Sequence, residues 1–168
     1  LVNNLETGTL VGDFAGNGSV FVGTDGSVYV NEYGVAQSDN MGSGTRAFKV
    51  SPDGRSSIIA SDLSGPVGNT VDKAGNYYFN NGNNNTSSDL MKLSVDGGQS
   101  LIATLEGFSG DILLSKDETH FYIPSWTQPL IRKVSMNGEV TVFTEDSQLS
   151  GVTGIVYGEG EDIILSNF

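Results

Sequence analysis

Short runs of apolar residues alternate with polar turns along the sequence, and the turns recur at a regular spacing. Four turns that contain glycine separate pairs of apolar runs, at Thr7-Gly8, Asp53-Gly54, Asp96-Gly97 and Asn137-Gly138. Their glycines are 46, 43 and 41 residues apart. Glycine, asparagine and aspartate tolerate the positive φ angles that tight hairpin turns require. A repeat of this length is typical of radially repeated sheets.

A second series of turns divides each repeat into two halves. It consists of Asp25-Gly26, Ala74-Gly75, Asp117-Glu118 and Gly160-Glu161. Each repeat therefore contains two hairpins, and the flanking runs of about five residues are rich in strand-forming residue types. We expect no helix longer than one turn. The fold class predicted is all-β, a β-propeller built from four-stranded antiparallel blades.

The repeats predict strand positions and a fourth blade that is split between the termini. In the second repeat we expect strands at 69–72, 77–80, 90–94 and 100–105, and in the third at 111–115, 120–124, 130–135 and 139–144. The sequence opens with a predicted outer hairpin (2–4 and 9–14) and closes with a predicted inner hairpin (155–158 and 162–166). Residues 1–168 thus form one propeller domain, or a portion of one, with about four blade equivalents.

Two ways of completing the split blade remain open. Either the chain closes its own four-bladed ring, or it is part of a larger ring, as a fragment of a longer propeller or as a partial propeller whose ring is completed by oligomerisation, for example as a homodimer. An unpaired edge strand invites association, so one of these arrangements must cover it.

Composition and charge narrow the choice of partners. The chain has 168 residues and a mass of 17.7 kDa, which fits one domain with its own core. It carries 20 acidic and 8 basic residues, whereas nucleic acids and anionic membranes require clusters of lysine and arginine. We therefore expect neither partner. Cysteine is absent and the first residue is not methionine, and we expect an extracytoplasmic or secreted protein from which an upstream segment was removed.

One segment resembles a known family of repeats. Residues 65–79, Gly-Pro-Val-Gly-Asn-Thr-Val-Asp-Lys-Ala-Gly-Asn-Tyr-Tyr-Phe, are similar to the blade consensus of NHL-repeat propellers and of the gluconolactonase/regucalcin family. Residues 151–157 with 163–167 repeat the pattern, and residues 47–54 resemble the family's outer hairpin. The resemblance implies a propeller fold, which occurs in enzymes, receptors and adhesive domains alike.

The same resemblance implies where a metal site would lie. The family's lactonases hold one divalent cation over the channel with a Glu, two Asn and an Asp, all oxygen ligands suited to Ca²⁺ or a similar ion. The matching positions here are Val67, Thr153, and Ser109 or Gly110. Valine cannot coordinate a cation, so we predict no tightly bound cofactor. If Ca²⁺ or another divalent cation does bind, Glu106 and Asp111 are the candidate ligands.

No nucleophile system is evident from the sequence. Cysteine is absent, and the single histidine, His120, opens a predicted strand beside Phe121 and Tyr122. A Ser-His-Asp arrangement needs the histidine within hydrogen-bond reach of a serine, and nothing in the spacing indicates one. No catalytic residue is therefore assigned.

The candidate ligand-binding residues lie in the predicted loops between the second and third strands of each blade. Residues 80–89 form an Asn-rich predicted loop, and the equivalent loops contain Asn31-Glu32-Tyr33 and Ser125-Trp126-Thr127-Gln128. Amides and aromatic rings together bind sugar hydroxyls or peptide backbone. The candidates are Tyr33, Asn81, Asn83, Trp126 and Gln128. Trp126 either stacks on a ligand or packs between blades.

These observations predict a non-enzymatic binding or interaction propeller. The ligand would be a small molecule, carbohydrate or protein, bound on the face that carries the loops between strands two and three and the connections between blades. One alternative is a lactonase-like, metal-dependent hydrolase with diverged or missing ligands. The other is a partial propeller that acts after oligomerisation.

Overall fold

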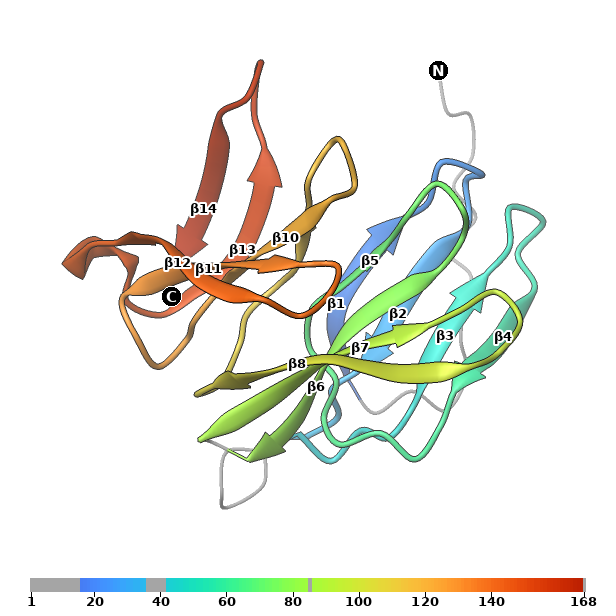
Figure 1. The fold of residues 1–168 in the computed structure, drawn as a ribbon. Helices are drawn as coiled ribbons and strands as arrows, with labels where there is room; N and C mark the ends of the chain where they lie inside the picture. The colour runs from blue at the N-terminus through green and yellow to red at the C-terminus, as the bar shows by residue number, and fades with distance from the viewer. Residues whose placement is uncertain (1–15, 36–41, 85, 168) are drawn as a thin grey trace.

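The computed structural model describes residues 16–35, 42–84 and 86–167. Three four-stranded antiparallel sheets are followed by a two-stranded sheet, and the innermost strands of successive sheets contact one another (Figure 1). This arrangement is that of propeller blades, and it confirms the fold class predicted from the turn spacing. The predicted hairpin at 2–4 and 9–14 lies outside the described residues.

Each blade runs from an inner first strand to an outer last strand. Blade 1 contains β1 (Asn17–Val22), β2 (Val28–Glu32), β3 (Ala47–Val50) and β4 (Ser56–Ala60). Blade 2 contains β5 (Asn69–Val71), β6 (Tyr77–Asn84), β7 (Ser87–Leu93) and β8 (Gln99–Glu106). Blade 3 contains β9 (Leu113–Leu114), β10 (His120–Pro124), β11 (Leu130–Ser135) and β12 (Val140–Glu145). The half-blade contains β13 (Val152–Tyr157) and β14 (Ile163–Asn167).

A single turn of 3-10 helix, η1 (Ser147–Leu149), is the helical element among the described residues, as the sequence predicted. The side chain of Asp146 caps it by accepting a hydrogen bond from the backbone N–H of Gln148 at 2.9 Å. β10 and β11 coincide with the predicted strands at 120–124 and 130–135.

The prediction of a ten-residue loop at 80–89 is wrong. β6 continues to Asn84 and β7 begins at Ser87, so the segment is the end of a long hairpin. Asn81 pairs with Asp89 in this ladder, although asparagine and glycine favour turns as isolated residues. Continued pairing satisfies backbone N–H and C=O groups that a loop would leave to water, which outweighs the local preference.

Aromatic and aliphatic side chains fill the spaces between blades. Between blades 1 and 2, Tyr77 stacks on Tyr29 and on Phe79, with ring centroids 5.6 Å apart in both pairs. Between blades 2 and 3, Tyr78 packs on Phe121 at 4.9 Å. All five rings are buried. These layers are the core of the domain, and their burial is the main favourable contribution to its stability.

Glycines at one repeat position let the inner strands approach closely. A methyl group at Gly68 would lie 2.6 Å from the carbonyl oxygen of Gly110 in the next blade. Gly18 meets the carbonyl oxygen of Pro66 at 2.7 Å in the same way, and Gly110 meets that of Val152 at 2.8 Å. Because each contact is with backbone, a side chain at these positions would push neighbouring blades apart.

Buried asparagines complete the joints between blades. The side-chain amide of Asn31 donates to the carbonyl oxygens of Val67 and Gly68, at 3.0 and 3.1 Å. The amide of Asn80 donates to the carbonyl oxygen of Gly110 at 2.9 Å. Each amide thus ties one blade to the start of the next inner strand, and the carbonyl oxygens of Val67 and Gly68 also accept hydrogen bonds from the backbone N–H groups of Ser19 and Asn80.

Candidate functional site

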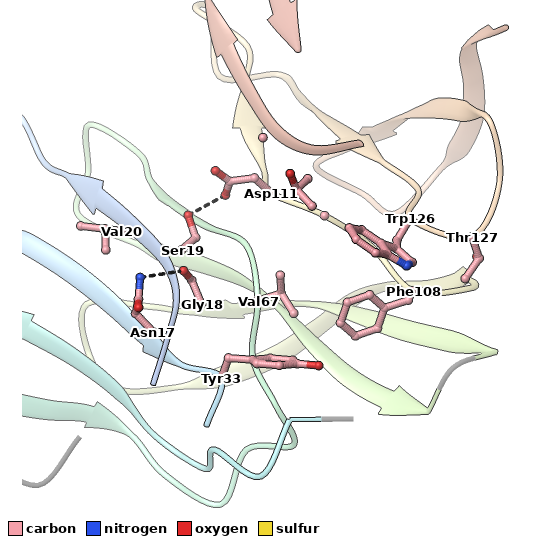
Figure 2. Close-up of a pocket in the computed structure, with 13 residues that line it drawn as sticks. Asn17, Gly18, Ser19, Val20, Tyr33, Val67, Phe108, Asp111, Trp126 and Thr127 are labelled. Atoms are coloured by element: carbon pink, nitrogen blue, oxygen red, sulfur yellow. Dashed lines mark hydrogen bonds between the residues drawn. The ribbon is translucent and has the colours of Figure 1, made fainter. Parts of the chain in front are cut away.

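A concave site lies at the ends of the inner strands. Its volume is about 1120 Å³, and residues from all three blades and from the half-blade line it (Figure 2). The lining residues are Asn17, Gly18, Ser19, Val20, Tyr33, Val67, Phe108, Gly110, Asp111, Trp126, Thr127, Thr153 and Gly154. We call this site the channel pocket. The β2–β3 and β10–β11 loops and the connections between blades all reach it, so it opens on one face of the propeller.

Three aromatic side chains form one wall of the channel pocket. Tyr33 meets Phe108 edge to face, with ring centroids 6.4 Å apart. Trp126 lies near Phe108 in Figure 2, and its backbone N–H donates to the carbonyl oxygen of Phe108 at 2.8 Å. The Trp126 side chain is 38% exposed. This wall offers flat apolar surface on which a ligand can stack.

Asp111 is the charged side chain among the lining residues. Its Oδ1 atom accepts hydrogen bonds from the Ser19 hydroxyl at 2.8 Å, the Ile112 N–H at 2.9 Å and the Asn69 N–H at 3.3 Å. Ser19 and Asn69 belong to blades 1 and 2, so this carboxylate joins three inner strands. Burial raises the pKa of Asp111, although these hydrogen bonds act in the opposite direction.

A buried arginine supports the loops that carry the aromatic wall. Arg132 on β11 is 6% exposed, and its Nη2 atom donates to the carbonyl oxygen of Glu106 at 2.7 Å and to Oε1 of Gln128. Glu106 leads into the segment that bears Phe108, and Gln128 closes the loop that bears Trp126. Arg132 therefore connects the two loops through its Nη2 atom. Burial lowers the pKa of the Arg132 guanidinium.

The structure brings two of the five predicted ligand-binding residues to the channel pocket, namely Tyr33 and Trp126. Asn81 instead accepts a hydrogen bond from the backbone N–H of Ser64 at 2.7 Å. Gln128 is held by Arg132. The side chain of Asn83 lies outside the described part of the chain. Two of the predicted amides are thus part of the framework.

The two candidate metal ligands differ in their relation to the channel pocket. Asp111 lines the channel pocket, whereas Glu106 does not and instead binds Arg132 through its carbonyl oxygen. Within residues 16–35, 42–84 and 86–167, no group of three or more His, Cys, Asp or Glu side chains could hold a metal ion. His120 lies outside the pocket lining, with Nδ1 2.8 Å from the hydroxyl of Thr119. Burial, followed by the charge of Lys133, lowers its pKa.

Sequence reasoning missed several lining residues, of which Ser19 and Phe108 are the most informative. Both lie within two residues of the repeated glycines at the inner strand starts, Gly18 and Gly110. That repeat position is visible in the sequence. Neighbours of these glycines could therefore have been assigned to the channel.

The chain resembles known proteins in structure. No protein-family model matches the sequence, and no curated protein matches it. Solved structures do match. A selenomethionine-substituted virginiamycin B lyase from Staphylococcus aureus has a TM-score of 0.70 and 18% identity, covering 91% of this chain and 49% of its own. A putative gluconolactonase has a TM-score of 0.69 and 15% identity, covering 92% and 56%.

A luciferin-regenerating enzyme matches with a TM-score of 0.65 and 12% identity, over 83% of this chain and 49% of its own. The chain is therefore a structural match to lyase and gluconolactonase-type β-propellers, and it spans about half the length of these solved chains. At such identities the likeness establishes the fold. No described helix is long and apolar enough to cross a membrane.

Proposed function

We propose that the channel pocket binds a small organic ligand without transforming it. The ligand presents a cationic, hydrogen-bond-donating group to Asp111 and a flat apolar face to Trp126 and Phe108. The observation that carries this proposal is the placement of one partly desolvated carboxylate and three aromatic rings on the same pocket. Those two kinds of group are complementary to the two ends of an aromatic amine.

The physical basis is the state of the Asp111 carboxylate. Burial has removed part of its hydration, so an incoming cation regains electrostatic energy that bulk water would otherwise screen. A cation near the aromatic wall also interacts favourably with the faces of the rings. The net charge of −12 draws cations toward the protein from a distance. Each of these three electrostatic effects would be unfavourable for a ligand that carries a carboxylate.

The carbohydrate hypothesis has less support after the structure is considered. It depended on clustered amides, and Asn81 and Gln128 bind elsewhere in the framework. An enzymatic role like that of the lyases draws its support from fold alone. Among the described lining residues there is no histidine or lysine, and Asp111 is the one acidic group.

A fluorescence titration tests this function, because Trp126 is the single tryptophan of the chain. The probes are 2-phenylethylamine and phenylacetate, which share a ring and differ in charge. We expect the amine to change Trp126 emission. It should also bind at least about tenfold more tightly than phenylacetate, because only the amine forms a charge pair with the partly desolvated carboxylate of Asp111. Equal binding of the two probes, or no saturable change with either, would contradict the proposal.

Amine binding should also depend on pH through Asp111. Binding requires the ionised carboxylate, and the pKa of Asp111 lies above its ordinary value of 3.8 because of burial. We therefore expect affinity to be constant at neutral pH and to fall as the pH drops through this raised pKa, while the amine stays protonated. The same titration with 2-phenylethylamine between pH 8 and pH 3 measures the midpoint. A midpoint at or below 3.8 would show that Asp111 does not hold the amine.

A further inference from the structure

Blade 3 carries an arginine at a repeat position where the other two blades carry an apolar residue. The third strand of each blade contains Lys-Val-Ser or Lys-Leu-Ser before its turn, which aligns Arg132 with Phe48 and Met91. Phe48 is buried, and Met91 packs against the core between blades 1 and 2. The strand ladders agree with this alignment, because each of the three residues lies opposite an apolar residue of the second strand, Ile123 in the case of Arg132. An apolar side chain therefore meets the needs of the blade framework at this position.

The charge of Arg132 has no close partner where it lies. The side chain faces blade 2, because Val134, two residues further along β11, packs in the core between blades 2 and 3. Its Nη1 atom is buried and has no hydrogen-bond partner among the described residues. None of the ion pairs in the described part of the chain includes Arg132. The carboxylate of Glu106 favours the charged guanidinium, but burial outweighs this effect and lowers the pKa of Arg132. Because burying such a charge costs stability, packing does not explain this arginine.

The hydrogen bonds that Arg132 does form reach the two segments that carry the aromatic wall. Nη2 donates to the carbonyl oxygen of Glu106 at 2.7 Å and to Oε1 of Gln128. Phe108 lies two residues after Glu106, and Trp126 lies two residues before Gln128. The N–H groups of a planar guanidinium point in fixed directions, so one nitrogen atom that binds two acceptors also fixes their separation.

The two segments are in close contact beside the rings. Gly107, with a φ of 76°, lies against Thr127, and a methyl group at Gly107 would collide with the Thr127 hydroxyl. These two residues are the immediate neighbours of Phe108 and Trp126. A change in the separation of the segments would therefore move both rings on the wall of the channel pocket.

We propose that Arg132 is a positioning residue for the channel pocket, which fixes the spacing of Phe108 and Trp126 so that the flat face of a ligand can stack on them. The proposal rests on the proposed function, because an aromatic amine is the ligand whose ring this wall would hold. A charge that burial makes unfavourable is then retained for ligand recognition. Departures from the rules of a packed core are expected at such sites.

Charge and position predict different effects when Arg132 is removed. The positive charge of Arg132 repels a cationic ligand, so its loss alone would tighten the binding of every amine. Loss of positioning would instead weaken the binding of an amine that carries a ring and leave a ringless amine unaffected. The ratio of the dissociation constants of n-butylamine and 2-phenylethylamine separates the two effects, because the ammonium group is common to both probes.

Arg132→Met gives blade 3 the residue that blade 2 carries at Met91, and isothermal titration calorimetry measures the ratio. We expect it to fall about fivefold, within the range that aromatic contacts contribute. The urea midpoint should stay equal or rise, as is usual when an apolar side chain replaces a buried charge. The control is Arg55→Met, which removes the same charge from a side chain that is 86% exposed and pairs with Asp53. It should leave the ratio unchanged.

Fluorescence anisotropy decay of Trp126, the single tryptophan, tests the positioning without any ligand. We expect more fast indole motion in Arg132→Met. A smaller increase is expected in Gln128→Ala, which removes one of the two acceptors and serves as the second variant if Arg132→Met does not fold. If the wild-type protein binds neither amine, the proposed function fails, and the anisotropy decay still tests the role of Arg132.

Three results would overturn the proposal. One is unchanged indole motion in both variants. Another is an unchanged ratio in Arg132→Met, or an equal change of the ratio in Arg55→Met. The third is a large fall in the urea midpoint of Arg132→Met, because it would assign the arginine to the packing of blades 2 and 3.

Discussion

Replacing Gly68 by alanine is expected to destabilise the protein by about 3 kcal/mol, at the upper end of the usual cost of overpacking a core. The added methyl group would lie 2.6 Å from the carbonyl oxygen of Gly110 and 2.7 Å from Cα of Asp111. Both atoms are backbone, so no side chain can rotate away, and blades 2 and 3 must separate. Urea unfolding followed by circular dichroism measures the loss as a lower midpoint.

The matched control is Gly154→Ala. Gly154 has the same repeat position, but its methyl group would meet only the Ser166 side chain, which can move. We expect a change within about 1 kcal/mol, as is usual where a flexible neighbour can adjust. Equal losses for the two variants would mean that packing between blades is not what the glycine at 68 provides.

Replacing Asp111 by asparagine is expected to abolish the preference of the channel pocket for an amine over a carboxylate. The amide oxygen of asparagine can accept the hydrogen bonds that Ser19, Asn69 and Ile112 now donate to Oδ1, so the joint between three blades is retained. The charge is lost. We expect 2-phenylethylamine to bind about tenfold more weakly, the cost of roughly 1.4 kcal/mol expected for one partly desolvated charge pair.

Glu139→Gln is the control for Asp111→Asn, because it removes the same charge from an exposed position at the β11–β12 turn. It should change amine affinity little, since charge at an exposed site is screened by solvent and salt. Isothermal titration calorimetry at fixed ionic strength compares the three proteins. Unchanged affinity in Asp111→Asn, or an equal loss in Glu139→Gln, would show that only the overall charge of the protein matters.

The sequence predicts the blades well because strand alternation and turn chemistry are local. Positive φ angles at Gly26, Gly54, Gly75, Gly97 and Gly138 are those that the turn series requires. β10 and β11 were located to the residue for the same reason. The loop predicted for the Asn-rich segment at 80–89 is wrong, because β6 and β7 pair there. Such pairing depends on two segments together and overrides the preference of single residues.

The channel pocket could be predicted only in part. Tyr33 and Trp126 stand out as aromatic residues in predicted loops, and the structure places both on the lining. The engagement of Gln128 by Arg132 depends on a residue buried on β11, which no loop motif reveals. The sequence predicts Asp111 as a candidate metal ligand. Its hydrogen bonds with blades 1 and 2 depend instead on how the inner strands lie beside one another in space. Such contacts are non-local and leave no local signature.

The most direct measurement of the proposed function is a map of where 2-phenylethylamine binds, from ¹H–¹⁵N correlation spectra recorded during a titration. We predict saturable shifts at the backbone amides of Gly110, Asp111 and Thr127 and at the indole N–H of Trp126, all on the channel pocket. The hollow lined by Tyr78, Lys92 and Met136 among others is a separate site and should show none. Shifts confined to that hollow, or no saturable shifts at the channel pocket, would contradict the account.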